Sequence, residues 1–245
     1  MIDGRKWFSS GAEGAGFGIV MAVTEPDVEP HRRATQIIVP ADAPGIEIRP
    51  VPIFGHRGHG WTTHCEVDYE GVRVPVENTL GEVGDGFRIA QKRLGPGRIH
   101  HVMRWLGQMQ RAFELLCRRA LEREAFGGPL AEKQTVQNWI ADSAAEIQAC
   151  RLMTLDAAHK IDAGDEARVE ISLIKFFAAR VLNDVIDRAI QVHGALGLTD
   201  RTPLATMALH ARGGRIYDGP DEVHRMVVSR RILKEFEGGG SWQFR

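Results

Sequence analysis

The sequence predicts an α+β protein in which a partial antiparallel β domain (residues 1–80) precedes a C-terminal up-and-down four-helix bundle (residues 81–245). Two observations lead to this prediction. The first part of the chain holds short segments rich in β-branched residues, and proline, glycine and aspartate separate them. From Gly86 onward, apolar residues recur with the 3.6-residue period of a helix.

Strand candidates in the first part are residues 18–24, 34–40, 45–50 and 64–69. Glu70–Gly71 is expected to form a turn after the last of them, and Asp3–Gly4 a turn before residues 5–9. The segment 5–9 has no earlier strand with which to pair. We therefore expect an incomplete sheet.

The second part predicts three long helices. The first runs to about Ala125, with a kink or a break at Gly95–Gly97, the second ends near Ala163, and the third ends at Gly194. Short loops between such helices favour an antiparallel bundle, to which a helix after Asp218 adds a fourth member. The expected buried faces are Val102, Trp105, Leu106, Met109, Phe113, Leu116 and Ala120 in the first helix, Val136, Trp139, Ile140, Ile147 and Leu155 in the second, and Val169, Leu173, Phe176, Phe177, Val181, Val185 and Ala189 in the third.

Composition narrows the function classes. A net charge of -1, with 43% hydrophobic and 26% charged residues, gives no electrostatic reason to expect nucleic acid or an anionic membrane as partner. No apolar run approaches ~18 residues and the first residues do not form a signal peptide, so we expect no membrane span. The three cysteines match neither a disulfide framework nor a metal site, which favours a reducing, cytoplasmic location and no bound metal.

The stretch from Arg215 to Arg225 is the most informative part of the sequence. Pro220 is expected at the first helical position after a Gly219 cap, so that Asp218 stands just before a helix. The Asp-Gly turn can present its carboxylate to a ligand. An Asp-Gly-Pro sequence taken alone is more simply explained as an ordinary helix cap.

This stretch and three others resemble the acyl-CoA dehydrogenase family, in the branch with Asp-Gly-Pro-Asp-Glu-Val-His in place of the usual Tyr-Glu-Gly. Family members combine an N-terminal helical domain, a central β domain and a C-terminal four-helix bundle. The resemblance covers the C-terminal two-thirds of a member, so we expect the helical domain and the first strands to be missing. The chain alone is then expected to bind FAD weakly or not at all.

The most specific match is Arg123-x-x-Phe126-Gly127-x-x-Leu130-x-x-x-Gln134. It resembles the family segment that binds the adenosine diphosphate part of FAD across a dimer interface. Arginine can donate charge-assisted hydrogen bonds to a pyrophosphate, and glycine permits close backbone approach. A helix end with a solvated, charged face is the simpler explanation that the residues leave open.

Two further segments match the family at its cofactor site. Gln191-x-x-Gly194 resembles a segment whose backbone approaches FAD, with Ala195 in place of a second glycine, and Trp7-x-Ser9 resembles the strand beside the flavin ring. A plain helix stop and a buried strand aromatic are the respective alternatives. The resemblance also assigns Pro220 and Glu222 to the cofactor.

The resemblance implies FAD-dependent oxidation of an acyl-CoA to its trans-2-enoyl-CoA. Asp218 occupies the place of the family's glutamate base, whereas Gly97 occupies an alternative base position and cannot accept a proton. Arg98, Tyr217 and Gly219 are assigned to the substrate.

The resemblance further implies a homodimer or homotetramer that passes electrons to an electron-transfer flavoprotein. An acyl-CoA oxidase, which would produce hydrogen peroxide, is one alternative. A non-catalytic helical dimerisation remnant of a dehydrogenase is another.

Overall fold

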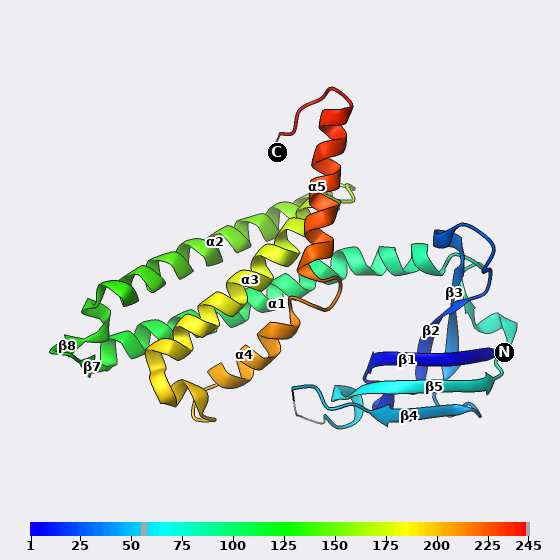
Figure 1. Ribbon diagram of the computed structural model, residues 1–245, viewed down its shortest axis with the longest axis horizontal. Helices are drawn as coiled ribbons and strands as arrows, with labels where there is room; N and C mark the ends of the chain where they lie inside the picture. Colours follow the sequence, from blue (N-terminus) through cyan, green and yellow to red (C-terminus); the bar gives the residue numbers. More distant parts are fainter. Residues whose placement is uncertain (55–57, 244–245) are drawn as a thin grey trace. The chain divides into compact units, whose positions relative to one another are not determined.

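The computed structural model describes residues 1–54 and 58–243 and has the predicted α+β architecture, with antiparallel sheets followed by helices (Figure 1). The chain forms two compact units, Met1–Arg93 and Leu94–Arg245. The strands are β1 (Ile2–Ser10), β2 (Phe17–Val23), β3 (Ala34–Pro40), β4 (Ile46–Pro50), β5 (His64–Val72), β6 (Thr79–Leu80), β7 (Glu124–Ala125) and β8 (Gly128–Pro129). The helices are α1 (Gly86–Glu122), α2 (Gln134–Asp162), α3 (Arg168–His193), α4 (Leu204–Gly213) and α5 (Asp221–Glu237).

The first unit holds two three-stranded antiparallel sheets, with the orders β1-β5-β4 and β2-β3-β6. The expected turn at Asp3–Gly4 is wrong, because both residues lie within β1, which pairs with the later strand β5 over most of its length. The expected turn at Glu70–Gly71 is wrong as well, since β5 continues to Val72. The Gly71 amide donates to Asp3 Oδ1 at 2.6 Å. Gly71 has a positive φ and lies where the register of β1 with β5 shifts, between the pairs Ile2–Val72 and Gly4–Tyr69, so the strand continues through it.

In the second unit, α2 and α3 lie side by side (Figure 1), and buried residues of α1, α2 and α3 share one hydrophobic core. Helix α1 continues through Pro96 rather than breaking there. Proline removes one helical hydrogen bond, but Pro96 and Lys92, whose carbonyl loses its donor, are both exposed, so water can replace that bond. The expected ends of α2 and α3 lie within a residue of the observed ones.

The apolar faces predicted for the three helices are buried or half-buried, with one exception. Leu155 of α2 is 51% exposed, so its assignment to the buried face is wrong. Helix α4 was not predicted from the sequence. Helix α5 begins at Asp221, with Pro220 as its N-cap residue rather than its first helical residue.

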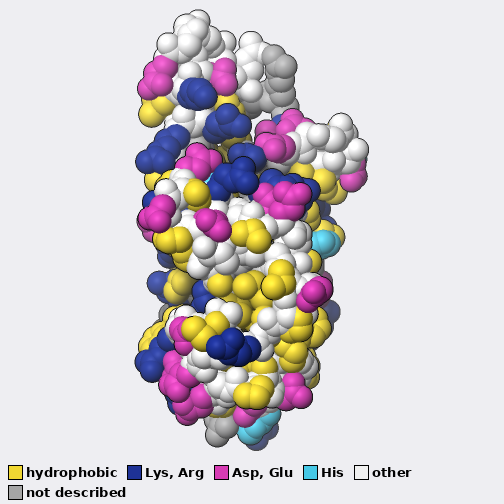
Figure 2. All heavy atoms as spheres, turned by 90° about the vertical axis from the view of Figure 1, so that its right-hand side faces the viewer, with side chains coloured by type: hydrophobic (Ala, Val, Ile, Leu, Met, Phe, Trp, Pro, Cys, Tyr) yellow, Lys and Arg dark blue, Asp and Glu magenta, His cyan; other side chains and the backbone are white. Residues whose placement is uncertain are grey.

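The surface carries both signs of charge. On the face drawn in Figure 2, Lys and Arg side chains are interspersed with Asp and Glu and with hydrophobic patches. This mixture agrees with a net charge of -1. Among residues 1–54 and 58–243, no helix combines the length and the apolar content that crossing a bilayer requires.

Candidate functional site

Asp218 lies in a tight loop between α4 and α5, and its backbone has a left-handed conformation (φ 52°). Aspartate tolerates this conformation better than most residues. Gly219 follows with a φ of 102°. The loop is closed by an ion pair between the Arg215 guanidinium and the Asp221 carboxylate (2.8 Å) and by the Asp221 amide, which donates to the Arg215 carbonyl (3.2 Å). The carboxylate of Asp218 is thus presented by a rigid turn.

One face of α1 meets this loop. Arg98, His101 and Trp105 recur at intervals of three and four residues, so they lie on the same side of the helix. His101 Nε2 lies 2.8 Å from Asp218 Oδ2, and Arg98 Nε donates to the Asp218 carbonyl at 2.9 Å. The indole of Trp105 donates to the Tyr217 hydroxyl at 3.1 Å.

Two aromatic rings pack against the histidine that contacts the Asp218 carboxylate. The imidazole of His101 packs against the rings of Tyr217 and Trp105, with centroids 4.8 and 6.0 Å apart. Burial raises the pKa of the Tyr217 hydroxyl, so this group is neutral at ordinary pH. The side chain of Asp218 keeps 25% of its surface exposed and is therefore partly desolvated but accessible.

Lys175 of α3 supports the loop from the protein interior. It is fully buried, and its Nζ donates to the carbonyls of Gly214 (2.7 Å) and Gly219 (3.2 Å). Burial lowers the pKa of Lys175 to about 8. This ammonium thus fixes the two ends of the turn that presents Asp218.

His224 of α5 lies under the same turn and is 2% exposed. Its Nε2 is 3.2 Å from the Asp218 carbonyl. Burial lowers the pKa of His224 to about 4, so the imidazole is neutral and can donate this hydrogen bond. A Cβ at position 219 would lie 2.8 Å from His224 Nε2, which explains why glycine stands there.

The structure therefore brings Asp218, Arg98, Tyr217 and Gly219 together, as the sequence analysis grouped them. Pro220 and Glu222 follow directly at the start of α5, and both are exposed. His101, Trp105, Lys175 and His224 were not assigned to a site from the sequence. Two signals could have indicated them: the Arg98-x-x-His101-x-x-x-Trp105 spacing, and a lysine at a buried position of an apolar helix face.

A two-residue hairpin between β7 and β8 presents Phe126 to solvent. Phe126 and Gly127 both have positive φ (52° and 84°), and the Phe126 side chain is 95% exposed. Arg123 lies just before this hairpin and Gln134 begins α2 just after it, and both are exposed. The Gln134 amide donates to Asn138 Oδ1 at 3.0 Å.

The end of α3 carries the Gln191 segment. Gln191 is exposed and lines a small hollow of about 200 Å³ together with Trp139 and Arg188. Gly194 has φ 60° and ψ -143°, a conformation open only to glycine, and Ala195 follows in a 3-10 turn. The helix stop by itself accounts for the glycine at position 194.

The segments around Arg123 and Asp218 are far apart along α1. His101, which contacts Asp218, and Arg123 are 22 positions apart (123 - 101), and the helix rises 1.5 Å per residue, so about 33 Å separates them. The structure does not join these two groups of residues into one site within the second unit.

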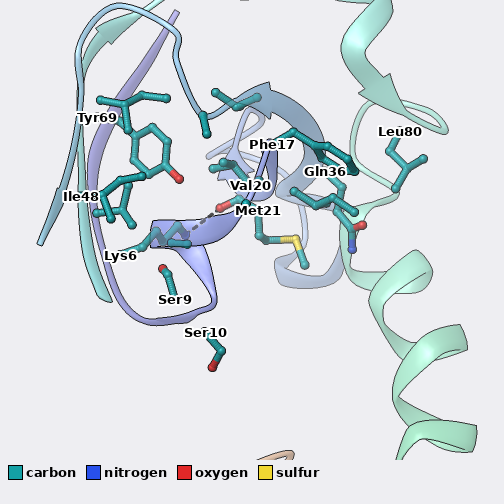
Figure 3. Close-up of a pocket in the computed structure, with 18 of the residues that line it drawn as sticks. Lys6, Ser9, Ser10, Phe17, Val20, Met21, Gln36, Ile48, Tyr69 and Leu80 are labelled. Carbon is teal, nitrogen blue, oxygen red and sulfur yellow. Dashed lines mark hydrogen bonds between the residues drawn. The ribbon is translucent and has the colours of Figure 1, made fainter. Parts of the chain in front are cut away.

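Trp7 and Ser9 belong to the first unit and stand at an irregularity of β1, where the register with β5 shifts between Lys6 and Ser9. Trp7 is 57% exposed, so the alternative of a buried strand aromatic is wrong. Both residues line a largely apolar cavity of about 740 Å³ between the two sheets (Figure 3). Lys6 also lines this cavity, and its Nζ donates to the Met21 carbonyl at 2.8 Å (Figure 3).

Comparison with known proteins agrees with this architecture. The family model of the acyl-CoA dehydrogenase middle domain matches residues 1–72, and that of the C-terminal domain matches residues 84–233. A Mycobacterium tuberculosis protein named a probable acyl-CoA dehydrogenase, FadE2, is 51% identical over 239 residues, which cover 95% of this chain and 58% of that protein. The chain thus spans little more than half the length of this relative.

Solved structures give the same result. A protein structure from Mycobacterium abscessus matches with a TM-score of 0.91 and 41% identity, over 96% of this chain and 59% of that one. Butyryl-CoA dehydrogenase from Megasphaera elsdenii matches with a TM-score of 0.85 and 30% identity, over 94% of this chain and 60% of that one. The chain belongs to the acyl-CoA dehydrogenase family.

Proposed function

We propose that the protein carrying this chain oxidises an acyl-CoA to its trans-2-enoyl-CoA, with Asp218 as the base that removes the pro-R α-proton. The observation that carries this proposal is the environment of the carboxylate. It is partly desolvated beside aromatic rings, and the His101 hydrogen bond and the rigid turn orient it. A partly desolvated, oriented carboxylate is suited to accept a proton from carbon.

The other residues of the site have supporting roles. Arg98 donates a hydrogen bond to the Asp218 carbonyl, and its guanidinium would lie beside the substrate. Tyr217 and Gly219 would form the surface that the acyl thioester contacts. Bound FAD would accept the hydride that leaves the β-carbon. Electrons would then pass to an electron-transfer flavoprotein. The name of the butyryl-CoA dehydrogenase supports an acyl-CoA as the class of substrate.

The residues present fit FAD. Around Arg123, an exposed guanidinium and the exposed amides of Gln134 and Gln191 can bind phosphate and nucleotide groups, and the Phe126 ring is available for stacking. The backbone at Gly194 and Ala195 is exposed as well. At the flavin end, Trp7 and Ser9 would lie beside the ring, and Pro220 and Glu222 would contact the cofactor from the start of α5.

These contacts require more than one copy of the chain. About 33 Å of α1 separates the Asp218 contact from Arg123, so we assign the two groups of residues to different cofactors in a homodimer or a homotetramer. Each cofactor would then be held by the Asp218 region of one protomer and the Phe126 hairpin of its partner.

The test of the base is Asp218→Asn in the flavin-loaded form of the longer protein that we propose carries this chain. This change keeps the shape of the side chain and removes the proton acceptor, so turnover should fall by about 10²- to 10⁴-fold while FAD stays bound. Asp142→Asn, the same change at an exposed position of α2, is the matched control and should leave turnover unchanged. Full activity of Asp218→Asn would move the base to another residue.

An acyl-CoA oxidase has the same first step and a different acceptor. Hydrogen peroxide measured during turnover in air separates the two activities, because only the oxidase forms it in step with the product. Wild-type protein without turnover on any acyl-CoA, despite bound FAD, would favour a non-catalytic dimerisation module.

A further inference from the structure

The His101 imidazole is hydrogen-bonded on both ring nitrogens. Its Nε2 lies 2.8 Å from Asp218 Oδ2. Its Nδ1 is hydrogen-bonded by the guanidinium of Arg104, which lies three residues further along α1. The three side chains thus form a continuous chain of hydrogen bonds from an exposed arginine to the candidate base.

The chemistry of arginine determines which atoms donate and which accept in this series of hydrogen bonds. A guanidinium has only N–H donors, so Nδ1 of His101 must be the acceptor of the Arg104 hydrogen bond. A neutral imidazole that accepts at Nδ1 carries its hydrogen on Nε2. His101 therefore donates to the carboxylate of Asp218.

We propose that His101 is the positioning residue of the Asp218 base and that Arg104 holds it in the Nε2–H tautomer. The catalytic consequence rests on the proposed function, whereas the tautomer does not. A hydrogen bond donated to a carboxylate favours its ionised form, so Asp218 stays ready to accept a proton at lower pH than it would alone. The bond also fixes which carboxylate oxygen faces the histidine.

Every neighbouring element contributes charged or titratable groups that bear on this pair. They are Arg98 and Arg104 from α1, Lys175 from α3, Tyr217 from the loop, and Asp221 and His224 from α5. Asp221 is compensated by Arg215, and His224 is neutral at ordinary pH because burial lowers its pKa to about 4. The variants below leave all of these groups except Arg104 in place.

The tautomer is tested by NMR on the protein labelled with ¹⁵N-histidine, at pH 7.5 and without substrate. The signals of His101 are those lost in His101→Gln, and we expect the long-range ¹H–¹⁵N pattern of an imidazole protonated at Nε2. Arg104→Met should change this pattern, and Arg111→Met, at another exposed position of α1, should not. An Nδ1–H pattern or an imidazolium pattern in the wild type would overturn the proposal.

The catalytic consequence is tested by kinetics on the flavin-loaded protein. His101→Phe keeps an aromatic ring beside Trp105 and Tyr217 and removes the donor, so kcat/KM should fall about 10- to 100-fold. The acidic limb of its pH–rate profile should also move to higher pH. His101→Gln restores a donor near the position of Nε2 and should recover part of the activity and return the limb towards the wild type.

An unmoved acidic limb in a folded His101→Phe protein would refute the positioning role. This result is distinct from a failure of the proposed function, which would appear as full activity of Asp218→Asn. The NMR result stands in either case.

Discussion

Two buried ionisable side chains support the backbone of the turn that carries Asp218. Lys175 binds the carbonyls of Gly214 and Gly219, and His224 binds the carbonyl of Asp218. Both side chains are almost completely buried, and burial lowers the pKa of each. Their positions are therefore maintained at the cost of unfavourable burial of ionisable groups, which makes the stability of the fold dependent on pH.

The lowered pKa of His224 predicts how the free energy of unfolding falls at acidic pH. Its pKa is lowered from 6.5 to about 4 in the folded state, so the unfolded chain binds more protons between these values. Stability should therefore be lost as the pH falls from 6.5 towards 4, by up to about 3 kcal/mol from this group. Urea unfolding of the wild type and of His224→Gln at pH 4.5 to 7.5 measures it, and the variant should show a smaller loss.

The matched control is His100→Gln, because His100 is exposed on α1. This variant should follow the wild-type dependence on pH. If His224→Gln lost stability on acidification as steeply as the wild type, a different group would be responsible. The comparison uses slopes, so an overall destabilisation of either variant does not affect it.

Among the secondary-structure elements, α1 and the β7–β8 hairpin present two separate groups of residues. Helix α1 presents Arg98, His101 and Trp105 to the Asp218 turn because their spacing follows the helical period. The hairpin instead forces Phe126 into a left-handed conformation and leaves its ring 95% exposed. A phenylalanine in this position gains nothing from burial within the chain and carries backbone strain.

Phe126→Asn should therefore have opposite effects on stability and on binding. Asparagine tolerates the left-handed conformation and suits a two-residue hairpin before glycine, so the unfolding free energy of the monomer should rise by about 1 kcal/mol. FAD affinity and dimer affinity should fall, because we assign the ring to the shared cofactor site. Urea unfolding, flavin fluorescence titration and sedimentation measure the three quantities.

Leu121→Asn is the control for Phe126→Asn, since Leu121 is an exposed apolar residue (69%) in the helical conformation of α1. It should lower stability slightly, because asparagine is a weaker helix former than leucine. Unchanged FAD affinity in Phe126→Asn would remove the hairpin from the proposed cofactor site.

In the whole molecule, several large apolar side chains of the second unit are not buried within a single copy of the chain. They include Phe126, Leu152, Leu198, Leu233 and Phe236. We expect another copy of the chain to cover part of this exposed apolar surface. The separation of Arg123 from the Asp218 region gives a second, independent reason to expect a symmetric assembly.

We accordingly expect the chain to sediment as a dimer or a larger oligomer, with a mass of at least twice 27.2 kDa at micromolar concentration. Sedimentation velocity over a range of concentrations measures this mass. A species of 27.2 kDa throughout would contradict both the shared cofactor site and the assembly.

Local periodicity in the sequence was sufficient to predict the α+β class, most strands and the three long helices. Turn residues also predicted where α2 and α3 end, since glycine stops a helix wherever it adopts a left-handed conformation. The position of Asp218 before a helix followed from Gly219 and Pro220 in the same way. Each of these inferences uses residues that are close in the chain.

Which residues surround Asp218 depends on how distant segments of the chain pack together. His101 and Lys175 lie 117 and 43 positions before it (218 - 101 and 218 - 175), and no local pattern encodes contacts over such separations. The same reason explains why the pairing of β1 with β5 and the exposure of Leu155 were missed. Strand pairing and burial depend on what packs against a segment, and that is settled when distant parts of the chain meet.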